Sequence, residues 1–211
     1  MFQRFGCRLR SVIALGLISL AASSPSHASF ISECHAALEM ADTPRAVKPC
    51  TQAGLDGDLK AQLFLGKGYK TPYRGFAKDI REALRWFEAA ASQGSGEAFA
   101  QMSMIYMDGD GVLQNYRKGR EYAEQAAIRG ETTSQYELAR IYTEGIGVQE
   151  NPRLAYVFST LCVFTSGGDG VWAYGCKDMR DEAERKMSPS QVQAAQDAAA
   201  KVVEISGMQG P

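Results

Sequence analysis

Residues 106–127, YMDGDGVLQNYRKGREYAEQAA, align with residues 142–163, YTEGIGVQENPRLAYVFSTLCV, at a shift of 36 positions. The tyrosine, two glycines, a valine and an asparagine coincide, so that Tyr106 lies over Tyr142. A period between about 20 and 50 residues is typical of repeat proteins, in which one supersecondary unit recurs. The chain is therefore expected to be an array of small, similar units.

Two further copies lie upstream of this pair. Tyr69, Asp79 and Ala83 take corresponding places in a third copy, which has one extra residue in its loop. A partial fourth copy, marked by Asp42 and Ala46, precedes the third by 37 residues. The positions that mark the repeat are small or aromatic: Gly66, Tyr69, Tyr106, Gly109, Gly111, Tyr142, Gly145 and Gly147.

Each unit is predicted to contain two helices. The first carries apolar residues at helical spacing, such as Met102 and Ile105, and glycine ends it. Asp79, Asn115 and Asn151 are favourable N-caps for the second. A single helix pair cannot bury its apolar faces, so the units must stack. We predict an all-α fold, a right-handed α-solenoid of antiparallel helix pairs with about three full repeats plus capping helices.

The repeat register also predicts the domain boundaries. In the last segment, Ser188, Pro189 and Gln191 have the pattern of a capping box before an alanine-rich helix. Among the departures from the pattern, Gly119 stands where the other copies have Ala83 and Ala155, and it is expected to loosen its helix by about 1 kcal/mol. The predicted segments are a signal peptide (1–28), an N-terminal partial repeat or cap (29–57), three repeats (58–94, 95–130 and 131–166), C-terminal capping helices (167–205) and a flexible tail (206–211).

The N-terminal segment has the three parts of a secretory signal peptide. Arg4, Arg8 and Arg10 are basic, residues 12–20 are apolar, and small residues lead to a cleavage point near Ala28. Nine apolar residues are too few for a membrane span, which needs about 20. The mature chain is expected in the periplasm or outside the cell, without a membrane span.

Charge argues against a nucleic-acid partner. Cleavage removes three of the 23 basic residues and none of the 24 acidic ones, which leaves a net charge of −4. Binding to nucleic acid requires a concentrated basic face, and this composition offers none.

Four cysteines remain after cleavage, namely Cys34, Cys50, Cys162 and Cys176. An even number in an exported chain indicates two disulfides. Three connectivities are possible, and the spacings of 16 and 14 residues favour the two local pairs, Cys34 with Cys50 and Cys162 with Cys176. A zinc site is disfavoured, because the mature chain has no C-x-x-C pair and only one histidine, His35.

The segment YMDGDGV, residues 106–112, suggests a calcium loop at first sight. In the aligned copy, Asp108 becomes Glu144 and Asp110 becomes Ile146, whereas the glycines remain. The residues that follow also lack the alternating oxygen ligands of such a loop. The segment therefore predicts a turn that ends one helix, and no metal or other cofactor is expected.

The repeat pattern resembles the Sel1-like repeat, a relative of the tetratricopeptide repeat, over residues 58–166. The chain looks like an exported bacterial member with disulfides that tie helices within hairpins. This resemblance implies an adaptor or regulator that binds another protein through the surface of the first helices. The residues expected on that surface are Phe64, Lys67, Gln101, Met104, Glu137 and Arg140.

Three partners fit such a protein: an envelope regulator, an envelope assembly factor, or a toxin that the chain neutralises as an immunity protein. Catalysis is the rival class, since some cysteine-rich relatives have been considered hydrolytic or penicillin-binding. However, the chain has no S-x-x-K motif, and its one mature histidine adjoins a cysteine expected to be oxidised. No catalytic residue is therefore assigned.

Thiol labelling tests the disulfide prediction. The exported, unreduced protein should contain no reactive thiol, and peptide mapping should recover the two local pairs. Free thiols after export would contradict the prediction and indicate a cytosolic protein with a misinterpreted N-terminal segment.

Overall fold

The computed structural model describes residues 27–72 and 76–210, and in these residues the chain forms ten α-helices. Most of the expected signal peptide therefore lies outside the described residues. The helices are α1 (His27–Glu39), α2 (Thr43–Leu55), α3 (Leu59–Lys70), α4 (Ile80–Ser92), α5 (Gly96–Asp108), α6 (Tyr116–Ala127), α7 (Thr132–Glu144), α8 (Pro152–Thr165), α9 (Val171–Arg185) and α10 (Pro189–Ser206).

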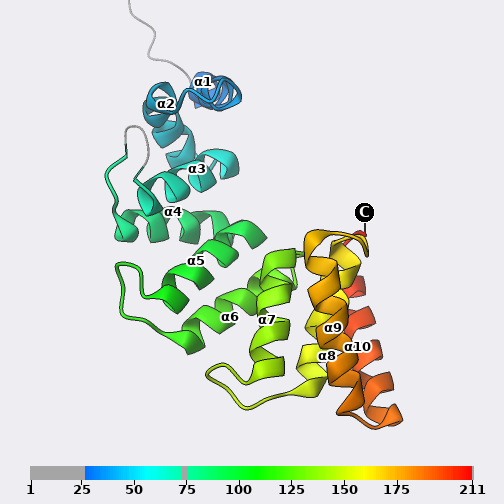
Figure 1. Ribbon diagram of the computed structural model, residues 1–211. Coiled ribbons are helices and arrows are strands. Elements are labelled where there is room, and N and C mark those ends of the chain that lie inside the picture. Colours follow the sequence, from blue (N-terminus) through cyan, green and yellow to red (C-terminus); the bar gives the residue numbers. More distant parts are fainter. Residues whose placement is uncertain (1–26, 73–75, 211) are drawn as a thin grey trace, which may run out of the picture.

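Consecutive helices pack against each other as a series of hairpins (Figure 1). The pairs α3–α4, α5–α6 and α7–α8 follow one another along the array, and α2, α4 and α6 also contact the first helix of the next pair. At the C-terminal end α9 packs on both α7 and α8, and α10 covers α8. The fold is an α-solenoid, as predicted.

The same backbone hydrogen bond closes each of the three central hairpins. The residue that caps the second helix donates its N–H to the carbonyl oxygen of the tyrosine near the end of the first helix. Its side chain then accepts a hydrogen bond from the first turn of the second helix. The N···O distances are 2.9 Å for Asp79 and Tyr69, 2.8 Å for Asn115 and Tyr106, and 2.9 Å for Asn151 and Tyr142.

Left-handed glycines end the first helix of the second and third repeats. Gly109 and Gly145 are the C-caps of α5 and α7, each with a φ of 70°. Gly111 and Gly147 follow in the same turns with a φ of 66°. This conformation is costly for residues with a Cβ atom, which explains why the turn keeps glycine in both copies.

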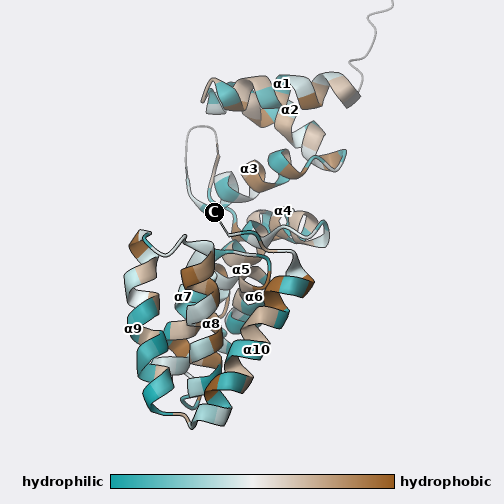
Figure 2. Ribbon diagram, turned by 90° about the vertical axis from the view of Figure 1, so that its right-hand side faces the viewer, coloured by the Kyte–Doolittle hydropathy of each residue, from teal (hydrophilic) through white to brown (hydrophobic). Residues whose placement is uncertain are grey.

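The core is a series of four hydrophobic clusters along the solenoid. They are centred on Cys34 and Ala46, on Leu65 and Trp86, on Phe87 and Met102, and on Leu138 and Phe158. Figure 2 shows that each helix carries both hydrophilic and hydrophobic residues. No helix among the described residues is long and apolar enough to cross a membrane.

Two disulfides lie at the two ends of the array. Cys34 in α1 bonds to Cys50 in α2, with a Cα–Cα distance of 4.7 Å. Cys162 in α8 bonds to Cys176 in α9, with a Cα–Cα distance of 6.2 Å. Each bond therefore ties two neighbouring helices in a terminal part of the solenoid.

A residue of the predicted C-terminal tail contacts the core. Met208 packs against the last hydrophobic cluster, and its Sδ lies 3.5 Å from the Nε2 of Gln135, which is fully buried. Gln135 also donates to the carbonyl oxygen of Ala127 at 2.9 Å. Met208 therefore covers the buried side-chain amide of Gln135.

Gly119 has a role that the sequence pattern did not indicate. It lies where α6 crosses α5, and a Cβ atom at this position would be 2.5 Å from Cγ of Met107 and 3.2 Å from the carbonyl oxygen of Ser103. The absence of a side chain therefore permits the close approach of the two helices. Close packing, and not loosening of the helix, is the main consequence of this glycine.

We predict that Gly119→Ala destabilises the protein although alanine is the better helix former. The gain in propensity is about 1 kcal/mol, whereas overpacking typically costs about 1–3 kcal/mol. Urea unfolding should show a net loss of stability. In a Met107→Ala background the loss should shrink or reverse, because the Cγ atom in the way is gone. A Gly119→Ala variant more stable than wild type with Met107 present would contradict this account.

Candidate functional site

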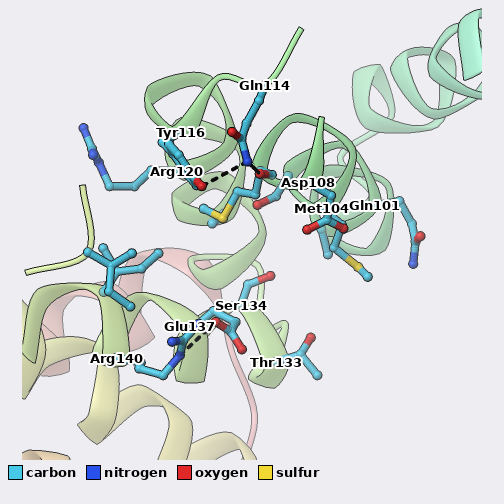
Figure 3. Close-up of a pocket in the computed structure, with 16 residues that line it drawn as sticks. Gln101, Met104, Asp108, Gln114, Tyr116, Arg120, Thr133, Ser134, Glu137 and Arg140 are labelled. Carbon is cyan, nitrogen blue, oxygen red and sulfur yellow. Dashed lines mark hydrogen bonds and ion pairs between the residues drawn. The ribbon is translucent and has the colours of Figure 1, made fainter. Parts of the chain in front are cut away.

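A groove opens between the α5–α6 hairpin and α7, where the second repeat meets the third (Figure 3). It encloses about 810 Å³, which falls in the range of ligand-binding clefts. Residues from α5, α6, α7 and the turns that follow α5 and α7 line it. We refer to this feature as the α5–α7 groove.

The α5–α7 groove combines apolar walls with a partly polar floor. Met104, Met107, Ile141 and Ile146 supply apolar surface, and the side chain of Met104 is 50% exposed. Methionine adapts its shape to different partners, so such walls suit binding of another chain. The polar lining residues include Gln101, Ser103, Asp108, Gln114, Ser134, Glu137 and Arg140.

The structure brings together four of the residues that the sequence proposed for a partner surface. Gln101 and Met104 of α5 lie on one side of the groove, and Glu137 and Arg140 of α7 lie on the other (Figure 3). Lys67 does not line the groove. It is exposed on α3 and pairs with Glu97 at the start of α5.

Phe64 was expected to face away from the core, and this expectation is wrong. Its ring packs edge-on against Phe76 at a centroid distance of 5.5 Å, and the side chain is partly buried beside two hydrophobic clusters. Phe76, which precedes α4, packs against Phe64 and Tyr69 of α3. It thus covers a position that the pattern alone assigned to the surface.

The charges of α7 are largely neutralised within the helix. Arg140 donates to the same Glu137 oxygen from Nε at 3.3 Å and from Nη2 at 2.8 Å, and it lies 3.6 Å from Glu144. The hydrogen bond to Glu137 raises the pKa of Arg140, so this residue stays cationic. Arg140 and Glu137 form a paired, polar edge to the groove.

Lys70 borders the groove, and sequence reasoning did not find it. Its Nζ donates to Oε1 of Gln101 at 2.8 Å and lies 3.8 Å from Sδ of Met104. Burial lowers the pKa of Lys70, and the nearby carboxylates of Asp108 and Asp110 oppose the shift. Only the packing of α5 over the end of α3 reveals this contact, which has no signal in the repeat pattern.

The marker tyrosines have structural contacts. Tyr106 accepts a hydrogen bond from Lys118 at 2.7 Å, and Tyr69 packs against the ring of Phe76. Tyr142 donates to Glu124 at 2.8 Å, and burial together with this hydrogen bond raises its pKa to about 12. A tyrosine with so high a pKa remains a neutral hydrogen-bond donor at physiological pH.

The candidate catalytic and metal-binding groups take part in packing and ion pairs. The Nε2 atom of His35 lies 3.0 Å from Asp58, which also caps α3, and Asp110 pairs with Lys78 at 2.6 Å. Across residues 27–72 and 76–210, no three His, Cys, Asp or Glu side chains converge on a point that could hold a metal ion. These contacts join neighbouring parts of the solenoid.

Comparison with known proteins identifies the repeat. A model of the Sel1 repeat matches residues 59–95, 97–131 and 132–158. A Sel1 repeat protein from Oxalobacter formigenes has a similar structure, with 20% identity and a TM-score of 0.57 over 83% of this chain and 88% of that one. The comparison with curated proteins gave no match.

Two other solved structures are more distant. A protective antigen of uropathogenic Escherichia coli strains, which displays an SLR fold, is 18% identical over 85% of this chain and 46% of that one, with a TM-score of 0.46. An immunity protein from Pseudomonas aeruginosa is 18% identical over 89% and 87% of the two chains, with a TM-score of 0.37. The three matched segments lie in the central hairpins α3–α8, and the chain thus contains three Sel1 repeats within an α-solenoid.

Proposed function

We propose that this chain is an exported, non-catalytic adaptor or regulator that binds another protein in the α5–α7 groove. The observation that carries the proposal is the groove itself, in which side chains from three helices surround one open space. Stacked helical repeats commonly use such extended concave surfaces to bind partners. Met104 supplies exposed apolar surface on the α5 side, and the Glu137–Arg140 pair supplies a polar rim on the α7 side.

Exposed apolar surface next to polar groups supports an interface. Met104 and Met107 both lie on α5, so their backbone is already helical before a partner binds and its ordering costs little. The residues around the groove do not include a histidine or a cysteine, which are common in nucleophilic and acid–base mechanisms. Binding is therefore the function that this lining supports best.

Substitutions at the groove should release the partner. Met104→Glu places a charge on the apolar wall, and Arg140→Glu leaves three acidic side chains together on α7. In pull-downs from envelope extract, each variant should retain less than about a tenth of the partner that wild type captures, as expected for a residue at an interface centre. Mass spectrometry identifies the protein, and its identity separates a regulator from an immunity protein.

Two matched variants serve as controls. Met40→Glu changes a methionine that is 60% exposed and lies outside the groove. Arg85→Glu disrupts the Arg85–Glu82 pair, which has the same spacing as Arg140–Glu137 but lies on α4. Both controls should capture the partner like wild type. If the groove variants fold, by circular dichroism, and still capture every partner, the groove is not the binding surface.

Export is tested separately through processing of the chain. N-terminal sequencing of protein from the periplasmic or culture fraction should begin at Ser29, since cleavage is expected after Ala28. A double substitution in the apolar segment, Leu15→Arg with Leu17→Arg, should block export, because charges prevent its insertion. An unprocessed N-terminus in an exclusively cytoplasmic wild-type protein would contradict the proposal.

A further inference from the structure

Two serines in the floor of the α5–α7 groove make no hydrogen bond within the protein. Ser103 of α5 and Ser134 of α7 are each only 6% exposed, and both line the groove. Within the described part of the chain, neither hydroxyl makes a hydrogen bond to a protein atom, and neither oxygen is fully enclosed, so both open onto the groove. A ligand that displaces water from such a hydroxyl without replacing its hydrogen bond loses about 1–3 kcal/mol.

A buried serine in a helix can usually satisfy itself by bonding to the carbonyl four residues earlier. Ser159 of α8 does so, because its hydroxyl donates to the carbonyl oxygen of Ala155. Ser103 and Ser134 make no such bond. Figure 3 shows the Ser134 hydroxyl directed into the space between α5 and α7. Both groups are thus available to a ligand in the groove.

The repeat shows that neither hydroxyl is needed for the fold. Ser103 occupies the position of Gly66 in the first repeat and Ala139 in the third. Ser134 occupies the position of Ala61 and Ala98, both completely buried. Small apolar residues therefore fill these positions elsewhere in the chain. Serine replaces them on the two helices that face each other across the groove.

The carboxylate of Asp108 favours a ligand that carries a basic group. It lines the groove at the end of α5 and makes no ion pair within 4.0 Å of a described residue, although its charge acts on the nearby Lys70. Two walls of methionine and isoleucine lie beside it. The groove thus offers hydroxyls at its floor, apolar surface at its sides and the carboxylate of Asp108.

We propose that the α5–α7 groove binds an extended segment of the partner polypeptide, with its backbone hydrogen-bonded to Ser103 and Ser134. An extended backbone has free N–H and C=O groups, whereas an amphipathic helix has already paired its own and would leave both serines unsatisfied. The segment carries an apolar side chain for the methionine wall and a basic one for Asp108. This inference rests on the proposed function and specifies how the partner is held.

The test uses a phage-displayed library of random linear peptides, selected on the full mature protein. Ser103→Ala and Ser134→Ala should each weaken the selected peptides roughly 3- to 10-fold, the value of one hydrogen bond. The same variants should unfold at an unchanged temperature, because glycine or alanine fills the equivalent positions of the other repeats. A structural role for the serines would instead lower the unfolding temperature. Ser92→Ala, an exposed serine of α4, is the control and should change neither quantity.

N-methylation of single peptide bonds gives a second readout. Methylation at the contacting position should reduce affinity in wild type, and the reduction should disappear in the matching serine variant. Asp108→Asn should reduce the preference for basic peptides. The inference is overturned if the library yields no groove-dependent peptide, or if selected peptides ignore both serine variants. The proposed function stands in that case as long as Met104→Glu releases the captured protein, and it falls if that substitution has no effect.

Discussion

The hydrogen bond from the cap of the second helix to the tyrosine carbonyl of the first sets the geometry of the three central hairpins. It recurs at 2.8–2.9 Å in three consecutive hairpins and fixes where the chain turns back. The position of the turn determines which residues meet where the two helices cross. Gly66 of α3, for example, lies against the ring of Phe87 of α4. Because the same closure repeats, similar hairpins stack in similar orientation, and the solenoid follows from local chemistry.

A fold of this kind is held together by neighbours only. Its interior is divided into clusters along the array, and a terminal hairpin has one neighbour where an internal hairpin has two. The two disulfides join helices in the terminal parts, where a missing neighbour reduces the stabilising packing most. Met208 has a comparable role, since it returns from the last helix to cover the buried amide of Gln135. The ends of the array are thus closed by covalent bonds and by a returning tail.

Features that depend on contacts within one hairpin could be predicted from sequence. The caps at Asp79, Asn115 and Asn151 and the glycine turns were found because each is encoded by a few adjacent residues. The covering of Phe64 by Phe76 and the role of Gly119 were missed, because both depend on how closely one helix approaches another element. The amides of Gln62 and Gln135, which bond to carbonyls of the preceding helix, escaped notice for the same reason.

The candidate site could be predicted only in part, and the reason is again physical. Outward positions on the first helices follow from helical periodicity, which led to Gln101, Met104, Glu137 and Arg140. Periodicity cannot say where neighbouring repeats separate enough to leave a groove, and Lys70 was overlooked as a result. The repeats do, however, provide an internal comparison. Where a residue differs from the equivalent residues of the other repeats and packing does not explain the difference, the residue is a candidate for a role in binding. By that criterion the serines of the groove floor are more informative than the glycines and tyrosines that define the repeat, because the latter are explained by the turns and packing they make possible.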